Sequence, residues 1–298
     1  MSEHLTVAVI GTGRMGAAMT ARLRSSGAEV VIFNRTVARA DEVAAATGAV
    51  VAASAAQAAA AAPVVLVSLA DDQAVAEVYG GPDGIAGGVW AGTVVADTST
   101  VDPRTVAEMA TLLTSRGAGL LDTPVSGSVS SVAQGTLTVL AGGDAADLDR
   151  ARPVLDRLSQ RIFHVGPSGA GAVMKLAVNS LVHGLNQALS EALVLAEKAG
   201  IDRHDAYDVI AASVAGAPFV QYKRDAFEHP DDAGVAFTVE LMAKDLGLAL
   251  GLAGRVGARL PQAMVNHRTA VTAIGAGLGH RDMAAIAELL RLYPGDIS

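Results

Sequence analysis

The sequence contains no cysteine among its 298 residues. Disulfide bonds, thiolate zinc sites and a thiol nucleophile are therefore excluded. Aromatic residues make up only 3% of the chain, although hydrophobic residues make up 51%. Alanine, valine and leucine must consequently fill the hydrophobic cores. A chain of this length predicts about two domains.

Basic residues are also scarce. Lys and Arg number 22 against 30 Asp and Glu, and the net charge of −8 argues against a nucleic-acid partner. The scattered histidines show no metal-ligand spacing, so we expect no metal site. The alanine-rich run at 43–69 is interrupted by Gly48 and Pro63 and does not read as a membrane span. No signal peptide is visible, and we expect a cytoplasmic protein without a membrane partner.

A glycine-rich motif follows the first predicted strand. Residues 5–10 are apolar and β-branched, an amphipathic helical pattern covers 15–26, and G-x-G-x-x-G joins them. In dinucleotide-binding folds these glycines form a tight turn, admit a pyrophosphate and pack the helix closely, while the helix N-terminus binds phosphate. The alternative is a glycine-rich turn without a ligand. We predict a cofactor site that includes Gly11, Thr12, Gly13, Arg14 and Met15.

The second predicted strand, at 29–33, ends in Asn34, Arg35 and Thr36. NAD-specific sites place an acidic residue here to bind the ribose 2′-hydroxyl. Arg35 can instead hold a 2′-phosphate, with Asn34 and Thr36 as hydrogen-bond donors. The segment therefore favours NADP as cofactor, with NAD still possible. The alternative is that Arg35 is an ordinary surface arginine.

Strand and helix patterns alternate as far as residue 165, with a glycine-rich turn expected at 80–88. This alternation predicts an α/β fold, a Rossmann-type doubly wound parallel sheet, over residues 1–165. Ligands bind at the carboxyl ends of such strands, where Leu69 and Thr100 also lie. Only helical patterns follow, so we expect an all-α second domain over 166–298.

The second domain begins with a helix of about thirty residues that ends at Gly200. It is apolar on most of its circumference, so we expect burial on several sides and a role as a spine between the domains. Lys175 and Asn179 are spaced i, i+4 and share one face, which His183 continues. A buried lysine is costly without a partner or a function. The alternative is a lysine that extends to solvent.

Two further polar segments interrupt apolar surroundings. Ser126, Gly127 and Ser128 lie just after a predicted strand, where backbone N–H groups can bind a carboxylate, although the composition is equally that of a plain loop. Lys244 and Asp245 interrupt an apolar helix predicted over 237–257. There the alternative is an intrahelical or surface charge pair.

Four segments together resemble the β-hydroxyacid dehydrogenase family, which includes the 3-hydroxyisobutyrate dehydrogenases. They are the cofactor segment VAVIGTGRMGAAMTARL at 7–23, DTPVSGS at 122–128, GPSGAGAVMKLAVN at 166–179 and FTVELMAKDLGLAL at 237–250. The resemblance covers nearly the whole chain. It implies a second domain similar to that of 6-phosphogluconate dehydrogenase, and a homodimer or homotetramer.

Three details are similar to the glyoxylate and succinic semialdehyde reductases of that family. These are the run from Asn34 to Thr36, Ser128 in place of a second glycine, and the segment from Lys175 to Asn179. Val178 departs from the dehydrogenase branch, which often has another asparagine there. The resemblance therefore implies NADPH-dependent reduction of a small aldehyde acid to its hydroxy acid.

The resemblance also implies roles for individual residues. Lys175 corresponds to the catalytic lysine and proton donor, and Asn179 orients it or the substrate. The implied substrate-binding residues are Ser126, Gly127, Ser128, Thr100, Phe237 and Asp245, and the implied cofactor contacts include Leu69, Thr100 and Lys244.

Three alternatives remain beside this reading. A 3-hydroxyisobutyrate-type dehydrogenase would use the same machinery with NAD. An imine reductase shares the architecture but usually carries aspartate or tyrosine at the position of Lys175. A non-catalytic NADP-binding protein would be expected to lack the pair of Lys175 and Asn179.

Overall fold

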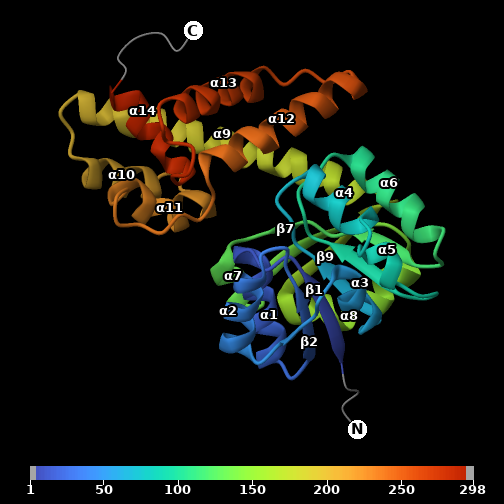
Figure 1. The fold of residues 1–298 in the computed structure, drawn as a ribbon. Coiled ribbons are helices and arrows are strands. Elements are labelled where there is room, and N and C mark those ends of the chain that lie inside the picture. The colour runs from blue at the N-terminus through green and yellow to red at the C-terminus, as the bar shows by residue number, and fades with distance from the viewer. Residues whose placement is uncertain (1–4, 293–298) are drawn as a thin grey trace. The chain divides into compact units, whose positions relative to one another are not determined.

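The computed structural model describes residues 5–292. The chain forms two compact units, Met1–Lys175 and Leu176–Ser298. The first unit contains the whole β-sheet, and the second is helical (Figure 1). The fold class expected from the sequence is confirmed.

The sheet of the first unit runs in the order β3-β2-β1-β4-β5-β6-β8-β7, and β9 pairs with β8. Its strands are β1 (Thr6–Ile10), β2 (Glu29–Phe33), β3 (Val50–Val51), β4 (Val64–Val67), β5 (Val94–Asp97), β6 (Gly119–Asp122), β7 (Val125–Ser126), β8 (Leu137–Gly142) and β9 (Ser159–Gly166). Strands β1 to β6 pair in parallel, as the alternating pattern predicts. All residues of β4 and β5 are buried, on both faces of the sheet, which is typical of parallel strands between two helical layers.

The sheet is not parallel throughout, which corrects the expectation. Strand β8 pairs antiparallel with both β6 and β7, and parallel with β9. Residues 127–136 separate β7 from β8, which is fewer than the dozen or so that a parallel crossover needs. The two-residue strand β7 lies in the segment expected to be a loop, and the glycine-rich stretch at 80–88 contains a short helix as well as a turn.

Helices cover both faces of the sheet (Figure 1). On one face, one apolar core includes residues of α1 (Arg14–Ser25), α2 (Val37–Thr47), α7 (Val129–Gln134) and α8 (Ala145–Leu158). On the other face, a second core includes residues of α3 (Ala55–Ala60), α4 (Asp72–Gly80), α5 (Ile85–Gly88) and α6 (Pro103–Thr114). Connecting loops follow the carboxyl ends of β1, β2, β4 and β5.

Helix α9 (Ala170–Lys198) confirms the expected long helix. It is buried along one stripe instead of on several sides, which corrects that expectation. The stripe includes Leu176, Asn179, His183 and Leu193, whereas Leu181 is 67% exposed on the opposite side. The stripe contains polar as well as apolar residues, and apolar residues elsewhere on the helix, such as Leu181, stay exposed, so an apolar circumference did not mean burial on several sides.

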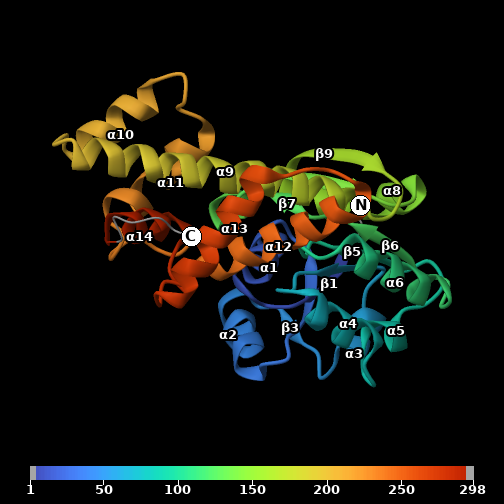
Figure 2. The same cartoon turned by 90° about the horizontal axis from the view of Figure 1, so that it is seen from above.

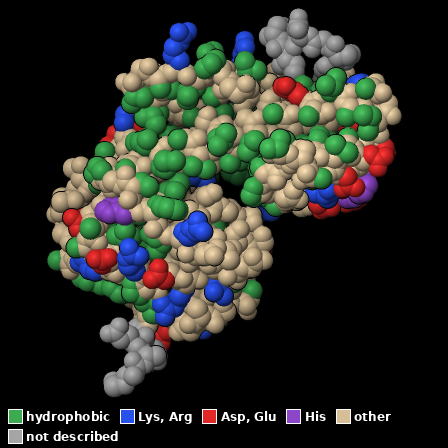
Figure 3. All heavy atoms as spheres, turned by 180° about the vertical axis from the view of Figure 1, so that it is seen from behind, with side chains coloured by type: hydrophobic (Ala, Val, Ile, Leu, Met, Phe, Trp, Pro, Cys, Tyr) green, Lys and Arg blue, Asp and Glu red, His purple; other side chains and the backbone are tan. Residues whose placement is uncertain are grey.

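The second unit continues with helices that pack around their own core. They are α10 (Arg203–Ala212), α11 (Pro218–Glu228), α12 (Val239–Val256), α13 (Pro261–Gly275), the 3₁₀ helix η1 (Met283–Ala285) and α14 (Ile286–Leu292). Helices α12 and α13 lie side by side (Figure 2). Apolar side chains are frequent on the surface drawn in Figure 3. In the second unit, Leu195, Val209 and Val271 are among the exposed apolar side chains. No helix within residues 5–292 is long and apolar enough to cross a membrane.

Candidate active site

The glycine-rich loop at the end of β1 has the geometry that a dinucleotide needs. A Cβ atom on Gly11 would lie 2.2 Å from the Ser68 carbonyl oxygen, and one on Gly16 would lie 1.9 Å from the Gly11 carbonyl oxygen. Close packing therefore requires both glycines. Gly13 differs, because a Cβ there would meet nothing within 4 Å and its φ of −66° is ordinary. The space over Gly13 is open, so a bound group is a physical reason for glycine at this position.

The start of helix α1 fits a negatively charged group. No side chain caps this helix through Gly13, and its first turn carries no acidic residue. The backbone N–H groups of a first helical turn have no intrahelical acceptor, and the helix dipole favours an anion there. The exposed Gly13 and Arg14 border this helix start. These residues fit the pyrophosphate of a nicotinamide dinucleotide.

Asn34 stabilises the glycine-rich loop. Its side-chain oxygen accepts a hydrogen bond from the Thr12 amide at 3.0 Å, and its side-chain nitrogen donates to the Thr36 carbonyl at 3.0 Å. The sequence suggested Asn34 and Thr36 only as phosphate donors. The structure adds a positioning role for Asn34, which ties the ends of β1 and β2 together.

Arg35 lies on the surface beside these residues. Its side chain is 84% exposed, and one guanidinium nitrogen is 3.4 Å from a carboxylate oxygen of Glu77 on α4. An exposed ion pair of this kind contributes little to stability. The guanidinium group can therefore exchange Glu77 for a phosphate at small cost.

Leu69 and Thr100 follow β4 and β5 in the same sheet. The Leu69 amide donates to the Ser99 hydroxyl at 2.9 Å, which links the two strand ends. Beneath them, the buried Tyr79 hydroxyl donates to Asp97 at 2.8 Å. Burial raises the pKa of both groups, and the Asp97 charge adds to the rise at Tyr79. Tyr79 therefore stays protonated and holds the end of β5.

Lys175 is half-buried in the second turn of α9. Its ammonium nitrogen donates to the Val125 carbonyl oxygen at 2.7 Å. The side chain of Lys175 is therefore held by the protein and does not extend freely to solvent. A backbone carbonyl is a neutral acceptor, which orients the ammonium group without neutralising it.

The segment after β6 places its small residues next to Val125. Ser126 belongs to β7, and Gly127 has φ +137°, a conformation that favours glycine. Ser128 precedes α7, and its amide donates to the Ser131 hydroxyl at 3.1 Å. Ser128 also shares a hydrogen bond with Ser130 at 2.7 Å. Ser128 therefore has a local structural role in addition to any contact with substrate.

The second unit brings Asn179 and Asp245 together. The Asn179 side-chain amide donates to Asp245 at 2.6 Å, and Lys244 lies 3.1 Å from the other carboxylate oxygen. The ring of His183 lies 3.9 Å from Asp245 and 5.6 Å from the ring of Phe237. Asn179, His183 and Asp245 are all buried. Four of these five residues are the second-unit members of the predicted site, and His183 is an addition.

The predicted residues thus form three local groups. The first unit gathers the glycine-rich loop with Asn34, and separately Lys175 with the segment at 125–128. The second unit gathers Asn179, Asp245, Lys244 and Phe237. Lys175 and Asn179 themselves belong to one helix, one turn apart. Within residues 5–292 no cluster of side chains could hold a metal ion.

Sequence reasoning missed two buried carboxylates. Asp122, at the end of β6, accepts hydrogen bonds from the Gly169 and Ala172 amides at the start of α9. Asp282, before η1, is paired with the buried Lys223 at 2.6 Å. Asp122 stands inside a motif that the sequence had singled out, and that signal could have drawn attention to it. Asp282 lies in a segment with no local sign of function.

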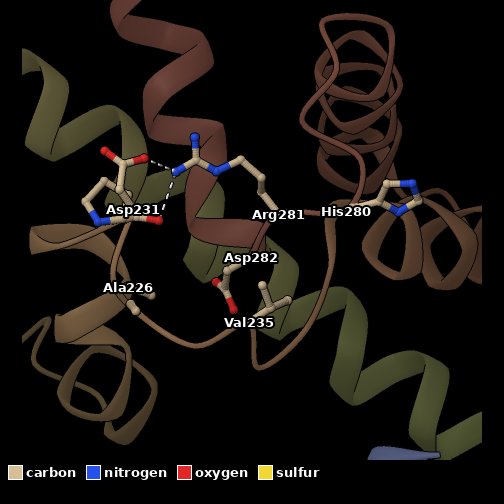
Figure 4. A pocket seen from close by; sticks show the side chains of 8 residues that line it. Ala226, Asp231, Val235, His280, Arg281 and Asp282 are labelled. Atoms are coloured by element: carbon tan, nitrogen blue, oxygen red, sulfur yellow. Dashed lines mark hydrogen bonds and ion pairs between the residues drawn. The ribbon is translucent and has the colours of Figure 1, made fainter.

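A pocket of the second unit lies beside Asp282 (Figure 4). Arg281 at its edge donates to the Pro230 carbonyl and to Asp231, each at 2.9 Å, and also pairs with Glu288. Its guanidinium group is thereby occupied by protein acceptors. None of the predicted site residues lines this pocket.

Comparisons with known proteins agree with this geometry. Residues 6–166 match the family model for the NAD-binding domain of 6-phosphogluconate dehydrogenase. Residues 169–290 match the model for the NAD-binding domain of NADP-dependent 3-hydroxyisobutyrate dehydrogenase.

Individual relatives span the full length. The chain is 34% identical to 2-(hydroxymethyl)glutarate dehydrogenase of Eubacterium barkeri, over 99% of this chain and 98% of that protein. It is 31% identical to glyoxylate/succinic semialdehyde reductase 1 of Arabidopsis thaliana, over 96% and 99% respectively. A solved structure of Mycobacterium tuberculosis 3-hydroxyisobutyrate dehydrogenase with L-serine superimposes with a TM-score of 0.84 at 33% identity, covering 97% of this chain and 99% of that one.

The fold, the glycine-rich loop and these matches define an NAD(P)-dependent oxidoreductase that acts on hydroxy acids. Within that class, the chain belongs to the β-hydroxyacid dehydrogenase family.

Proposed function

We propose that this protein is an NADPH-dependent reductase of small aldehyde acids, of the glyoxylate or succinic semialdehyde type. The observation that carries the proposal is the ammonium group of Lys175 beside the segment at 125–128. One positive charge there lies next to small residues and backbone groups that can bind a carboxylate. The similarity to the Arabidopsis reductase supports the same substrate class.

Lys175 is the proposed catalytic acid. Bound NADPH supplies the hydride. The ammonium group of Lys175 stabilises the negative charge that develops on the substrate oxygen, and it donates the proton that yields the hydroxyl group. The bond to the Val125 carbonyl at 2.7 Å keeps the ammonium group oriented without an anionic partner at that contact.

Asn179 follows Lys175 by one helical turn and is the second proposed catalytic residue. Its amide is fixed by Asp245, so it can orient the lysine or the substrate oxygen with little loss of side-chain entropy. Ser126, Gly127, Ser128 and Thr100 are proposed to bind the substrate carboxylate, and Phe237 and Asp245 are further proposed substrate-binding residues.

The proposed cofactor preference rests on Arg35. No acidic residue follows β2, and Arg35 is exposed next to the glycine-rich loop. A guanidinium group binds a phosphate through two parallel hydrogen bonds. Leu69, Thr100 and Lys244 complete the proposed cofactor contacts. The expected homodimer or homotetramer stays a prediction, which light scattering would test.

The proposal is tested by NADPH oxidation with glyoxylate, succinic semialdehyde, methylmalonate semialdehyde and a cyclic imine, each repeated with NADH. Turnover of the first two with NADPH is the expected result. Lys175→Ala should lower kcat by at least about 100-fold while NADPH still binds, since a positioned acid contributes that much. Lys198→Ala, at an exposed lysine on the same helix, is the matched control. Near-normal turnover of Lys175→Ala would refute the lysine assignment.

The same panel separates the alternatives. Turnover of methylmalonate semialdehyde with NADH would place the protein with the 3-hydroxyisobutyrate dehydrogenases. Reduction of the imine would indicate an imine reductase. NADPH binding without turnover of any compound would favour a non-catalytic protein.

A further inference from the structure

Asp122 links the end of the sheet to the start of helix α9. One of its carboxylate oxygens accepts from the Gly169 amide and the other from the Ala172 amide, both at 2.8 Å. The side chain is 2% exposed. These two N–H groups lie before and inside the first turn of the helix, where no intrahelical acceptor is available. A carboxylate at this end also interacts favourably with the helix dipole.

The surrounding glycines are the reason that the contact can form. A Cβ on Gly171 would lie 2.5 Å from the Asp122 carbonyl oxygen and 2.3 Å from the Leu140 carbonyl oxygen. A Cβ on Gly142 would lie 2.6 Å from the Asp122 carboxylate. Gly169 has φ +91°, which favours glycine. Only a glycine-rich chain can therefore bring α9 onto β6 and β8 this closely.

The segment that begins with Asp122 also binds the ammonium group of Lys175. Asp122 is three residues before Val125, whose carbonyl accepts from the lysine ammonium at 2.7 Å. Asp122 thus fixes where the helix begins, while Val125 fixes where the lysine side chain ends. Lys175 is one turn beyond Ala172, so a displacement of the first turn would carry the lysine with it.

We propose that Asp122 is a positioning residue for Lys175, which sets the height and rotation of the first turn of α9 relative to the segment at 125–128. The inference rests on the proposed catalytic role of Lys175 and deepens it. Asp122 has no proposed contact with substrate or cofactor. Burial raises the pKa of Asp122, whereas the hydrogen bonds from the Gly169 and Ala172 amides lower it. Burial is the larger effect, so the pKa of Asp122 is raised overall, and the two amide contacts offset part of that rise by favouring the ionised form.

Asp122→Asn tests the inference, because an amide nitrogen cannot accept and one of the two N–H groups loses its acceptor. The control is Asp144→Asn, since Asp144 makes the same kind of bond, at 2.8 Å, to the start of α8. Gly169→Ala is the second variant, to be used if Asp122→Asn does not fold. Its new Cβ meets only Pro103 at 3.8 Å, but the backbone is strained.

Two readouts are measured on the folded full-length protein, as judged by thermal unfolding. The first is kcat together with the Kd for NADPH. The second needs no turnover: it is the extent of acetylation of Lys175 by acetic anhydride, read by peptide mass spectrometry relative to the exposed Lys198. We expect Asp122→Asn to lower kcat at least about 10-fold, because a displacement of about 1 Å in a catalytic group can lower the rate about 100-fold. The Kd for NADPH should stay within about twofold of the wild type, because Asp122 has no proposed contact with the cofactor. The acetylation ratio should rise at least threefold, with no change in Asp144→Asn.

An unchanged acetylation ratio in folded Asp122→Asn would overturn the inference, whether or not kcat falls. Any effect on the rate would then not arise from a change in the position of Lys175. If the wild type reduces no compound of the panel, the proposed function fails, and a raised acetylation ratio still establishes that Asp122 positions the lysine. The two failures are therefore distinguishable.

Discussion

The side-chain amide of Asn179 donates to a carboxylate oxygen of Asp245 over 2.6 Å, and both side chains are buried. They are separated by 66 residues and belong to α9 and α12 of the second unit. Lys244 lies 3.1 Å from the same carboxyl group, which compensates part of its charge. The contact fixes the orientation of an amide that the proposed mechanism uses.

Loss of this amide should affect catalysis more than loss of another buried amide. Asn179→Ala is expected to lower kcat by about 100-fold, the cost of removing one aligned donor from an active site. Asn186→Ala is the matched control, because Asn186 is buried on the same helix but donates to the Met283 carbonyl at 2.9 Å. It should lower the free energy of unfolding and leave kcat within about threefold. Equal losses of kcat in both variants would contradict the role of Asn179.

Arg35 should determine the choice between the two cofactors. Arg35→Ala is expected to lower kcat/KM with NADPH by about 10- to 100-fold, since a hydrogen bond to a charged group contributes about 1.5–3 kcal/mol. The value with NADH should not change, because NADH has no 2′-phosphate. Steady-state kinetics with both cofactors provide the measurement, and Arg116→Ala, at an exposed arginine after α6, is the control. An equal loss with both cofactors would rule out contact with the 2′-phosphate.

The buried pair of Lys223 and Asp282 should be important for stability. The ammonium nitrogen lies 2.6 and 2.8 Å from the two carboxylate oxygens, and Asp282 also accepts from the Ala236, Phe237 and Ala284 amides. Lys223→Met leaves a buried carboxylate without this cation, which typically costs about 3–5 kcal/mol. Urea unfolding at pH 7 measures the cost.

An exposed ion pair provides the comparison for that result. Arg152 and Asp149 lie 3.2 Å apart with side chains 46% and 75% exposed. Arg152→Met should therefore cost no more than about 1 kcal/mol. A similar cost for both variants would mean that burial does not govern the contribution of Lys223.

Glu197 should make stability depend on pH in the acid range. Two nitrogens of Arg291 each lie 2.7 Å from its carboxylate, and Arg203 lies 3.1 Å away. Burial alone raises the pKa of Glu197, but the hydrogen bonds and charges of Arg291 and Arg203 outweigh it, so the pKa is lowered from 4.5. The carboxylate therefore stabilises the folded state fully above the unfolded pKa, and this contribution is lost as pH falls through the lower, folded value.

Glu197→Gln is accordingly expected to lower the free energy of unfolding at pH 7 by about 1.5 kcal/mol, the lower end for hydrogen bonds to a charged group. The difference from the wild type should shrink as pH falls below 4.5, the unfolded pKa from which Glu197 is lowered. Urea unfolding of both proteins between pH 7 and 3 is the measurement. A difference that stays constant down to pH 3 would exclude an effect of the ionised carboxylate.

Local patterns were sufficient for much of the fold. The run from Gly11 to Gly16 predicted a tight turn and close helix packing, and the structure places the would-be Cβ atoms of both end glycines within 2.2 Å of backbone oxygens. The long helix before Gly200 was predicted from its apolar content and its glycine stop, and Gly200 has φ +93°. Such features depend on neighbours within a few residues, so the sequence contains them directly.

Contacts between residues that lie far apart in the sequence could be identified only from the folded structure. The direction of β8 depends on how few residues connect it to β7 and on which edge of the sheet is vacant, and alternating patterns do not encode either property. The apolar circumference of α9 predicted burial on several sides, whereas the folded helix is buried along one stripe that includes the polar Asn179 and His183.

The sequence by itself was sufficient to identify the family, the dinucleotide-binding loop and the candidate catalytic lysine, because each depends on a motif of nearby residues at fixed spacing. Only the tertiary structure decided that Asn34 braces the glycine-rich loop, that Val125 holds Lys175, and that Asp122 anchors the helix start from 47 residues away. These contacts join residues that no local pattern relates. Buried polar groups take whichever partner the packed backbone brings within hydrogen-bonding distance, and that distance is set by the fold as a whole.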